Sequence, residues 1–210
     1  MESRVGPFDR SDADPSLEAR LGVGLLRLQQ ALASSRGAAA REIEASPLGL
    51  QILIDVAGRG GATTASWLAA RYGVTAATVS DALRTLTDRG WVSRTGAPRD
   101  ARRSLLRLTP AGRRRVNRLD RWGREIEALV RTIPTERRGL FLEDLLEILR
   151  ELERRGKITT DRMCVTCRYF RKDRHEGPKP HHCELLDAPL APGDLRIDCD
   201  EHAVPAAPAG

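Results

Sequence analysis

The chain has 210 residues, enough for one domain of ordinary size plus an appendage, and carries 35 Lys and Arg against 29 Asp and Glu. It has no apolar run of membrane-spanning length, and its first residues lack the apolar core of a signal peptide, so we expect a cytoplasmic protein. The positive excess is confined to residues 58–154, where twenty Lys and Arg face twelve Asp and Glu. An imbalance restricted to one segment favours a nucleic-acid partner over a generally adhesive surface.

The N-terminal part of the chain predicts a polar start followed by two helices. Residues 1–15 combine charged side chains with glycine and proline and are expected to be disordered. Leucines recur at helical spacing over 16–35. Gly22 and Gly24 each weaken that helix by about 1 kcal/mol relative to alanine, so it should pack against a second helix. Residues 46–57 open with a serine N-cap and a proline at the first helical position, and their apolar composition predicts a buried helix.

Two short helical patterns come next and predict a helix–turn–helix. The first covers residues 65–72 and stops at Gly73; the second begins at Thr75, a suitable N-cap, and ends at Gly90. The apolar stripe of the second helix consists of Val79, Ala82, Leu83 and Leu86. The face expected to enter the major groove of DNA carries Thr75, Ala77, Thr78, Ser80 and Arg84. Arg84 should contact a guanine edge or a phosphate; an ordinary amphipathic helix with a solvated face is the alternative.

A basic β-hairpin is predicted behind this helix. Residues 91–95 and 104–108 have the composition of two strands, and the turn between them contains glycine and proline. The tip of the hairpin carries three arginines and one aspartate: Arg99, Arg102, Arg103 and Asp100. The arginines are expected to reach the minor groove or its flanking phosphates, with Asp100 positioning them through charge-assisted hydrogen bonds. From Arg89 to Arg124 the chain has twelve Arg and two Asp, with no Lys or Glu, which favours a polyanionic partner.

Two more helices are predicted after the hairpin. Thr109 and Pro110 open the first, which should run to Thr132 with a basic first half. The second covers 134–156 and is rich in leucine. An isolated chain of this size has too little surface to cover leucine-rich helices at both ends, so we expect them to pair with those of a second copy. A monomer in which these helices close the core is the alternative.

The stretches LGLQILIDVA, LAARYGVTAATVSDALRTLTDRGWVSRT and RDARRSLLRLTPAG together resemble the MarR family of bacterial transcriptional regulators. The Asp-x-Arg of the hairpin (Asp100, Arg102) and the sequence LTPAG carry much of the resemblance, which covers residues 17–154. It implies a mainly α fold with a small β-hairpin wing over 16–156. It also implies a homodimer that binds duplex DNA with two reading heads about one DNA turn apart. Asp81 departs from the pattern, since relatives often carry a basic or neutral group there, so the base preference stays open.

Residues 157–202 belong to no general pattern of that family and contain all four cysteines, spaced C-x2-C-x15-C-x15-C. The segment is too poor in apolar residues to be held by burial alone, and cysteines in a reducing compartment are more often metal ligands or redox thiols than disulfides. We therefore expect one metal centre to stabilise it through Cys164, Cys167, Cys183 and Cys199. Four incidental thiols are the alternative. Residues 203–210 are expected to be a disordered tail.

The sequence favours a 4Fe–4S cluster at these cysteines and leaves zinc open. Structural zinc ligands usually come as two closely spaced pairs, whereas a 4Fe–4S cluster tolerates single, widely separated cysteines. The opening CxxCxYF also resembles small iron–sulfur modules of the high-potential-like kind. Four histidines are candidates to replace a thiolate or to hydrogen-bond a ligand: His175, His181, His182 and His202.

Two functional classes fit these features. The first is a homodimeric, sequence-specific DNA-binding transcriptional regulator whose cysteine site is structural or senses redox or metal state. The second is a thiol-redox or metal-dependent enzyme with a helix–turn–helix attachment. The CxxC follows no strand of a βαβ unit, and the chain has no P-loop, dinucleotide-binding glycine pattern or serine elbow. We therefore predict a regulator with no catalytic residues; the sequence does not indicate its operator or any small-molecule effector.

Overall fold

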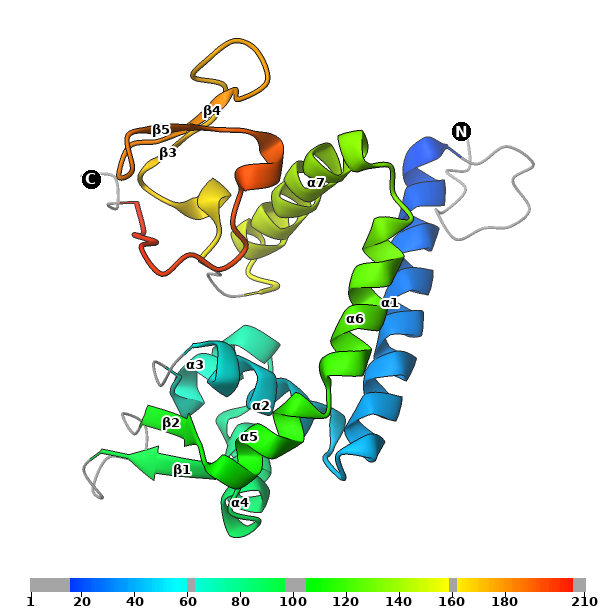
Figure 1. The fold of residues 1–210 in the computed structure, drawn as a ribbon, viewed down its shortest axis with the longest axis vertical. Coiled ribbons are helices and arrows are strands. Elements are labelled where there is room, and N and C mark those ends of the chain that lie inside the picture. The colour runs from blue at the N-terminus through cyan, green and yellow to red at the C-terminus, as the bar shows by residue number, and fades with distance from the viewer. Residues whose placement is uncertain (1–15, 60–62, 97–104, 159–161, 206–210) are drawn as a thin grey trace, which may run out of the picture.

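The computed structural model describes residues 16–59, 63–96, 105–158 and 162–205. They form a winged-helix head (residues 46–118), a stem made of two paired helices, and a C-terminal segment (162–205) that packs on the last helix (Figure 1). Within these ranges, no helix has the length and apolar character needed to cross a bilayer.

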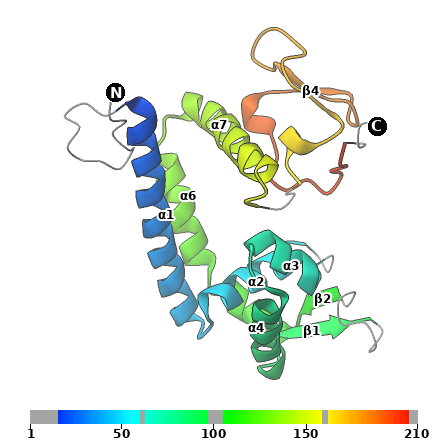
Figure 2. The ribbon, with the colours of Figure 1, turned by 180° about the vertical axis from the view of Figure 1, so that it is seen from behind.

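The stem consists of α1 (Leu17–Glu42) and α6 (Asp120–Arg131), which lie side by side in both views (Figures 1 and 2). The Ser16 hydroxyl caps α1 by accepting a hydrogen bond from the Ala19 amide at 3.1 Å. The indole Nε1 of Trp122 in α6 donates to the Ser35 hydroxyl of α1 at 2.8 Å. α1 extends beyond residue 35, where the sequence pattern predicted its end, because its last turn is buried in the head.

Three helices form the head, and their ends follow the capping residues. They are α2 (Pro47–Gly58), α3 (Ala65–Tyr72) and α4 (Ala76–Asp88). The side chains of Ser46, Thr64 and Thr75 each accept a hydrogen bond from an amide three residues on. Gly73 ends α3 in the left-handed conformation (φ 63°), which glycine adopts without strain. The predicted helix–turn–helix is therefore confirmed.

The predicted hairpin is also confirmed. β1 (Val92–Thr95) and β2 (Leu105–Leu108) pair antiparallel, with Val92 opposite Leu108 and Thr95 opposite Leu105. Thr63, just before α3, forms a further bridge to Leu106, so the wing is bonded to the helix–turn–helix and not only to its own partner strand.

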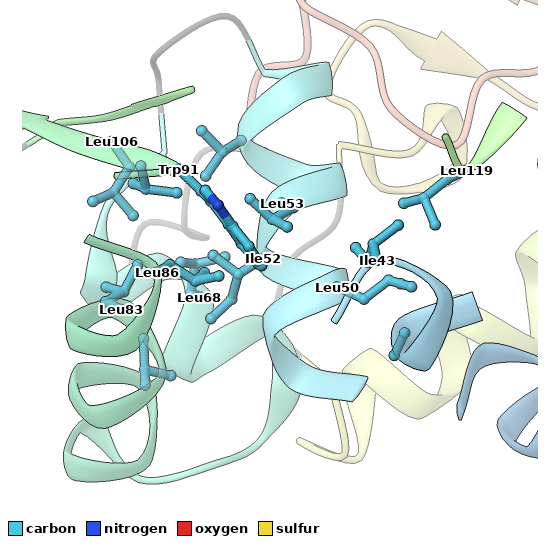
Figure 3. Close-up of a cluster of buried hydrophobic side chains, with 14 of the residues drawn as sticks. Ile43, Leu50, Ile52, Leu53, Leu68, Leu83, Leu86, Trp91, Leu106 and Leu119 are labelled. Atoms are coloured by element: carbon cyan, nitrogen blue, oxygen red, sulfur yellow. The ribbon is translucent and has the colours of Figure 1, made fainter. Parts of the chain in front are cut away.

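The core of the head joins α2, α3, α4 and the wing to the end of α1 (Figure 3). Leu50, Ile52 and Leu53 of α2 are fully buried at its centre. Residues from the surrounding elements complete it: Ile43, Leu68, Leu83, Leu86, Trp91, Leu106 and Leu119. Each large aliphatic side chain buried in this way contributes about 1.5–3 kcal/mol relative to exposure, so this cluster stabilises the fold of the head.

The single helix predicted over 109–132 is wrong, since the chain breaks into α5 (Pro110–Asn117) and α6. Leu119, in the turn between them, is buried in the core of the head. The Arg118 guanidinium donates to the carbonyl of Glu42 at 2.6 Å. A continuous helix would carry the chain away from α1. The break lets α6 turn and run along it.

The last helix, α7 (Thr135–Arg154), supports the C-terminal segment. That segment holds two short 3₁₀ turns and a small antiparallel sheet of order β3-β4-β5. In chain order its elements are η1 (Cys164–Thr166), β3 (Phe170–Arg171), β4 (His181–Cys183), β5 (Ala188–Leu190) and η2 (Pro192–Asp194).

A second, much smaller core joins this segment to α7. Its buried members are Leu146 of α7 with Met163 and Leu195 of the segment. Gly139 of α7 lies against the backbone of η2, so close that a Cβ added there would be 2.9 Å from the Gly193 amide nitrogen. The segment is therefore docked on α7 by a few apolar side chains and one close backbone approach.

Candidate nucleic-acid interface and four-cysteine site

The polar face of α4 points into solvent. Val79, Leu83 and Leu86 are buried against the core. The residues predicted to face DNA are all exposed: Thr75, Ala77, Thr78, Ser80 and Arg84. The Thr75 hydroxyl accepts from the Thr78 amide at 3.1 Å and lies 2.9 Å from the Thr78 hydroxyl, so it first serves as the helix cap.

Arg84 forms an ion pair with another residue on this face. Its guanidinium Nη2 lies 2.7 Å from Oδ1 of Asp81, one turn earlier, and about two-thirds of each side chain is exposed. An exposed pair of this kind contributes only about 0–1 kcal/mol, so a phosphate or a base edge can compete for the guanidinium. Asp81 therefore orients Arg84, a role that the sequence pattern did not indicate.

The tip of the wing lies outside the described residues, and with it Arg99, Asp100, Arg102 and Arg103. Four other arginines on the wing and α5 are exposed or partly exposed at the same end of the head: Arg94, Arg107, Arg113 and Arg114. In the part of the chain that the structure describes, none of the four makes an ion pair. In the sequence, only the positions of these four arginines on short strands and on an exposed helix could have indicated that they are available to a partner.

Other arginines of the basic run hold the fold together. The guanidinium carbons of Arg89 and Arg115 lie 5.0 Å and 4.9 Å from the ring centroid of Trp91. Arg115 also pairs with Glu44 at 3.1 Å, and Arg118 binds the last carbonyl of α1. These cations stabilise the C-terminal end of α1, where the helix dipole favours positive charge. Part of the charge that indicated a polyanionic partner is thus used internally.

A helix with an exposed polar face, preceded by a short helix and followed by a two-stranded wing, defines a winged helix–turn–helix protein. The fold is of the MarR-like winged-helix type. Residues 48–103 match the model of the MarR family. The comparison with curated proteins gave no match.

Solved structures share this fold over about two-thirds of the chain. MepR of S. aureus in complex with DNA has a TM-score of 0.55 and 20% identity, covering 65% of this chain and 99% of its own. MarR of Staphylococcus aureus in complex with salicylate and kanamycin has a TM-score of 0.55 and 16% identity, covering 65% and 91%. PcaV from Streptomyces coelicolor, in complex with its natural ligand, has a TM-score of 0.50 and 27% identity, covering 67% and 98%.

The C-terminal segment brings all four cysteines to the wall of one cavity of about 300 Å³. Cys164 and Cys167 belong to η1 and its end, Cys183 to the end of β4, and Cys199 to the loop after η2. All four are partly buried and carry free thiols. Widely separated parts of the sequence thus line one cavity, while the common metal site that the cysteine spacing predicts stays a prediction.

Arg196 links two of these cysteines. Its amide donates to the Cys164 sulfur at 3.2 Å, and its carbonyl accepts from the Cys164 amide at 2.9 Å. Its guanidinium lies 4.0 Å from the Cys199 sulfur. Burial raises the pKa of the Cys164 thiol, and the neighbouring thiols, first that of Cys199, raise it further.

No histidine of the described residues lines this cavity. His181 is buried beside Phe170, and its Nε2 lies 3.4 Å from Glu143 of α7. His202 bonds to the Thr166 hydroxyl at 3.0 Å, while His175 and His182 bond to each other at 3.1 Å. The histidines therefore stabilise the segment and its docking on α7, and the potential metal ligands on the cavity wall are the four cysteines and two carboxylates, Asp194 and Glu201.

The loop that carries Cys199 also contacts the head. Asp198 lies 2.7 Å from Arg162 and 3.7 Å from Arg59, which follows α2. The Arg59 guanidinium lies over the ring of Trp67 in α3, 4.1 Å from its centroid. Only 11% of the Arg59 side chain is exposed, so burial lowers its pKa, and the charge of Arg162 lowers it further.

Proposed function

We propose that the protein is a sequence-specific, DNA-binding transcriptional regulator that acts in the cytoplasm. The observation that carries the proposal is the exposed polar face of α4 next to a wing rich in arginine. The MarR-like fold supports it, and one structure of that fold, S. aureus MepR, was solved in complex with DNA. In this role α4 lies in the major groove, and the wing follows the phosphates beside it.

We further propose that the regulator is a homodimer formed by the stem and α7. These helices expose many large apolar side chains: Leu17, Leu21, Leu25, Leu26, Leu28, Leu129, Val130, Leu140, Phe141, Ile148 and Leu152. So many exposed apolar side chains are unfavourable in water, and a symmetric copy of the same helices would cover them. Two heads would then face the same side of a duplex. Sedimentation equilibrium should give the mass of a dimer, and a stable monomer would reject this part of the proposal.

The third part of the proposal is that the four cysteines bind a metal centre. A common cavity wall, free thiols and a small apolar core support it. The centre contributes the stability that burial alone does not give this segment. By holding or releasing the segment, it can also make the protein responsive to redox or metal state.

Gel shifts at several salt concentrations test the DNA-binding role. We expect the logarithm of the binding constant to fall linearly with the logarithm of salt concentration.

Arg84→Ala should cost about 1–3 kcal/mol of binding free energy and relax preference at one base position. Arg107→Gln, or neutral substitutions at Arg102 and Arg103, should weaken all sequences alike and flatten the salt slope. Arg150→Ala, on the exposed side of α7, is the control that should change neither. A purified dimer with no salt-dependent affinity for any duplex would overturn the proposal.

A further inference from the structure

We propose that the cavity between the four cysteines holds a [4Fe–4S] cluster and not a single zinc ion. The inference rests on the proposed metal-binding role of the C-terminal segment and names the cofactor. Its basis is the combination of two observations. All four thiols line one cavity, and the described residues contain no group of three Cys, His, Asp or Glu side chains arranged to hold one metal ion.

The distinction follows from the size of the two centres. A tetrahedral zinc ion draws four sulfur atoms close together, because each Zn–S bond is only about 2.3 Å long. In a cluster each thiolate binds its own iron at a separate corner, so the sulfurs lie further apart around a larger body. A cavity of about 300 Å³ lined by all four thiols has room for the second arrangement.

The remainder of the cavity wall suits a cluster as well. Tyr169, Phe170, Leu185, Leu186 and Leu190 are its apolar side chains, and Asp194 and Glu201 are its carboxylates. The Arg196 amide, 3.2 Å from the Cys164 sulfur, provides the kind of N–H···S hydrogen bond that tunes clusters. The Arg196 guanidinium, 4.0 Å from the Cys199 sulfur, offsets the negative charge that four thiolates bring.

Loading would be a ligand exchange with a thiolate-bound donor of the [4Fe–4S]²⁺ core. Each of the four cysteines would form one Fe–S bond in place of one to a donor thiolate, and that thiolate would take up the proton that the cysteine thiol releases. No electron is transferred in this step. The chain supplies ligands, hydrogen bonds and an apolar wall.

Metal and sulfide analysis of the full-length protein, purified without oxygen, tests the assignment. We expect about four iron atoms and four acid-labile sulfides per chain, a brown colour, and Mössbauer parameters of a tetranuclear cluster. Cys183→Ser and Cys199→Ser should each reduce the iron content at least several-fold. Glu176→Gln, exposed and outside the cavity wall, should leave it unchanged.

Several outcomes would overturn the cluster. One zinc per chain without sulfide, two irons per chain, or a folded protein without metal would each do so. If the serine variants do not fold, the Mössbauer spectrum of the unaltered protein decides alone. A protein that holds the cluster but does not bind DNA would reject the regulator and leave the cluster standing.

A second observation, the contact of Asp198 with the head, carries a separate inference. We infer that Asp198 transmits the state of the cysteine site to the helix–turn–helix through Arg59. Asp198 precedes Cys199 directly and holds two guanidinium groups, those of Arg59 and Arg162. If the Cys199 loop moves, these two cations lose the carboxylate between them.

The consequence for the head follows from the burial of Arg59. Its Nε is buried and has no hydrogen-bond partner among the described residues, so Asp198 and the Trp67 ring are its main compensation. Loss of the carboxylate favours withdrawal of the guanidinium into water, away from Trp67. Because Trp67 belongs to α3 and packs against the core of the head, its repacking changes the support of α4.

Affinities of the metal-loaded and chelated protein for one operator duplex test this coupling. We expect them to differ at least several-fold in the unaltered protein and to become equal in Asp198→Asn and in Arg59→Gln. Asp187→Asn removes an exposed carboxylate that contacts only His182 among the described residues, and it should retain the difference. Equal affinities in the unaltered protein, or a difference that survives both substitutions, would overturn the inference whatever metal the site holds.

Discussion

The head and the C-terminal segment are stabilised in different ways. The core of the head is one cluster of fifteen buried apolar residues, which come from α2, α3, α4 and the wing, from the end of α1 and from the turn after α5. The C-terminal segment shares a cluster of only three fully buried residues with α7, and the rest of its order depends on short strands, ion pairs and four cysteines. A region with a large core stays folded without a ligand. We expect a region with so small a core to need one, because burial contributes only about 25 cal/mol per Å² of apolar surface.

Removal of the metal should separate the two regions most clearly. Structural metal sites in small domains contribute on the order of 10 kcal/mol of apparent binding free energy, so chelation should unfold residues 162–205. Hydrogen exchange followed by mass spectrometry should show lost protection there and retained protection in α2 and α4. Equal protection of the segment before and after chelation would mean that its small core suffices.

Gly112→Ala should cause the largest loss among the substitutions. A Cβ at Gly112 would lie 2.0 Å from the carbonyl oxygen of Trp91, and the next two atoms it meets also belong to the Trp91 backbone, so no flexible side chain can move away. We expect a loss of about 3 kcal/mol or more in the unfolding free energy of the head, measured with urea. Gly123→Ala meets no atom within 4 Å in the described chain and should gain about 0.5–1 kcal/mol as an ordinary helical substitution. Similar stabilities for the two variants would contradict the packing described for α5.

Gly139→Ala should act on the other region and more weakly. The added Cβ would lie 2.9 Å from the Gly193 nitrogen, and the segment can relieve the clash by moving away from α7 at a cost of about 1–3 kcal/mol. Proteolysis of the native protein should speed up within 162–205, while the urea transition of the head remains unchanged. Gly123→Ala serves again as the control, and a shift of the head transition would show that the two regions unfold together.

Thr75→Ala should have the smallest effect, and within the head only. The substitution removes the cap of α4, in which Thr75 accepts from the Thr78 amide, and should cost about 1 kcal/mol. Thr87→Ala in the last turn of the same helix removes a hydroxyl without removing a cap. A matching loss in both variants would show that the hydroxyl of Thr75 does not act as a cap.

Sequence and structure agree best where local chemistry sets the conformation. The ends of α3 and α4 were predictable because Thr64, Thr75 and Gly73 act on amides and backbone angles within a few residues. The break before α6 was not, because it depends on the burial of Leu119 in a core assembled from distant elements. No local signal marks that position as a helix end.

The candidate sites show the same difference between features that a local pattern predicts and features that depend on distant residues. Periodicity placed the polar face of α4 correctly, and cysteine spacing predicted that four thiols would share one site. The internal use of Arg89 and Arg115 around Trp91 was not predictable, because a guanidinium that stacks on an indole and one that meets a phosphate look the same in a sequence. The contact between Asp198 and Arg59 spans a separation in sequence that no pattern encodes.

The position of Leu146 on α7 has a consequence for the abundance of the protein in the cell. Its side chain is fully buried against Met163 and Leu195, in a segment that is synthesised after α7. If the proposed metal centre holds that segment in place, a newly made polypeptide without metal would keep this leucine and its neighbours Leu142 and Leu149 uncovered, as a target for chaperones and proteases. The steady-state abundance of the protein would then follow the supply of that metal in the cell.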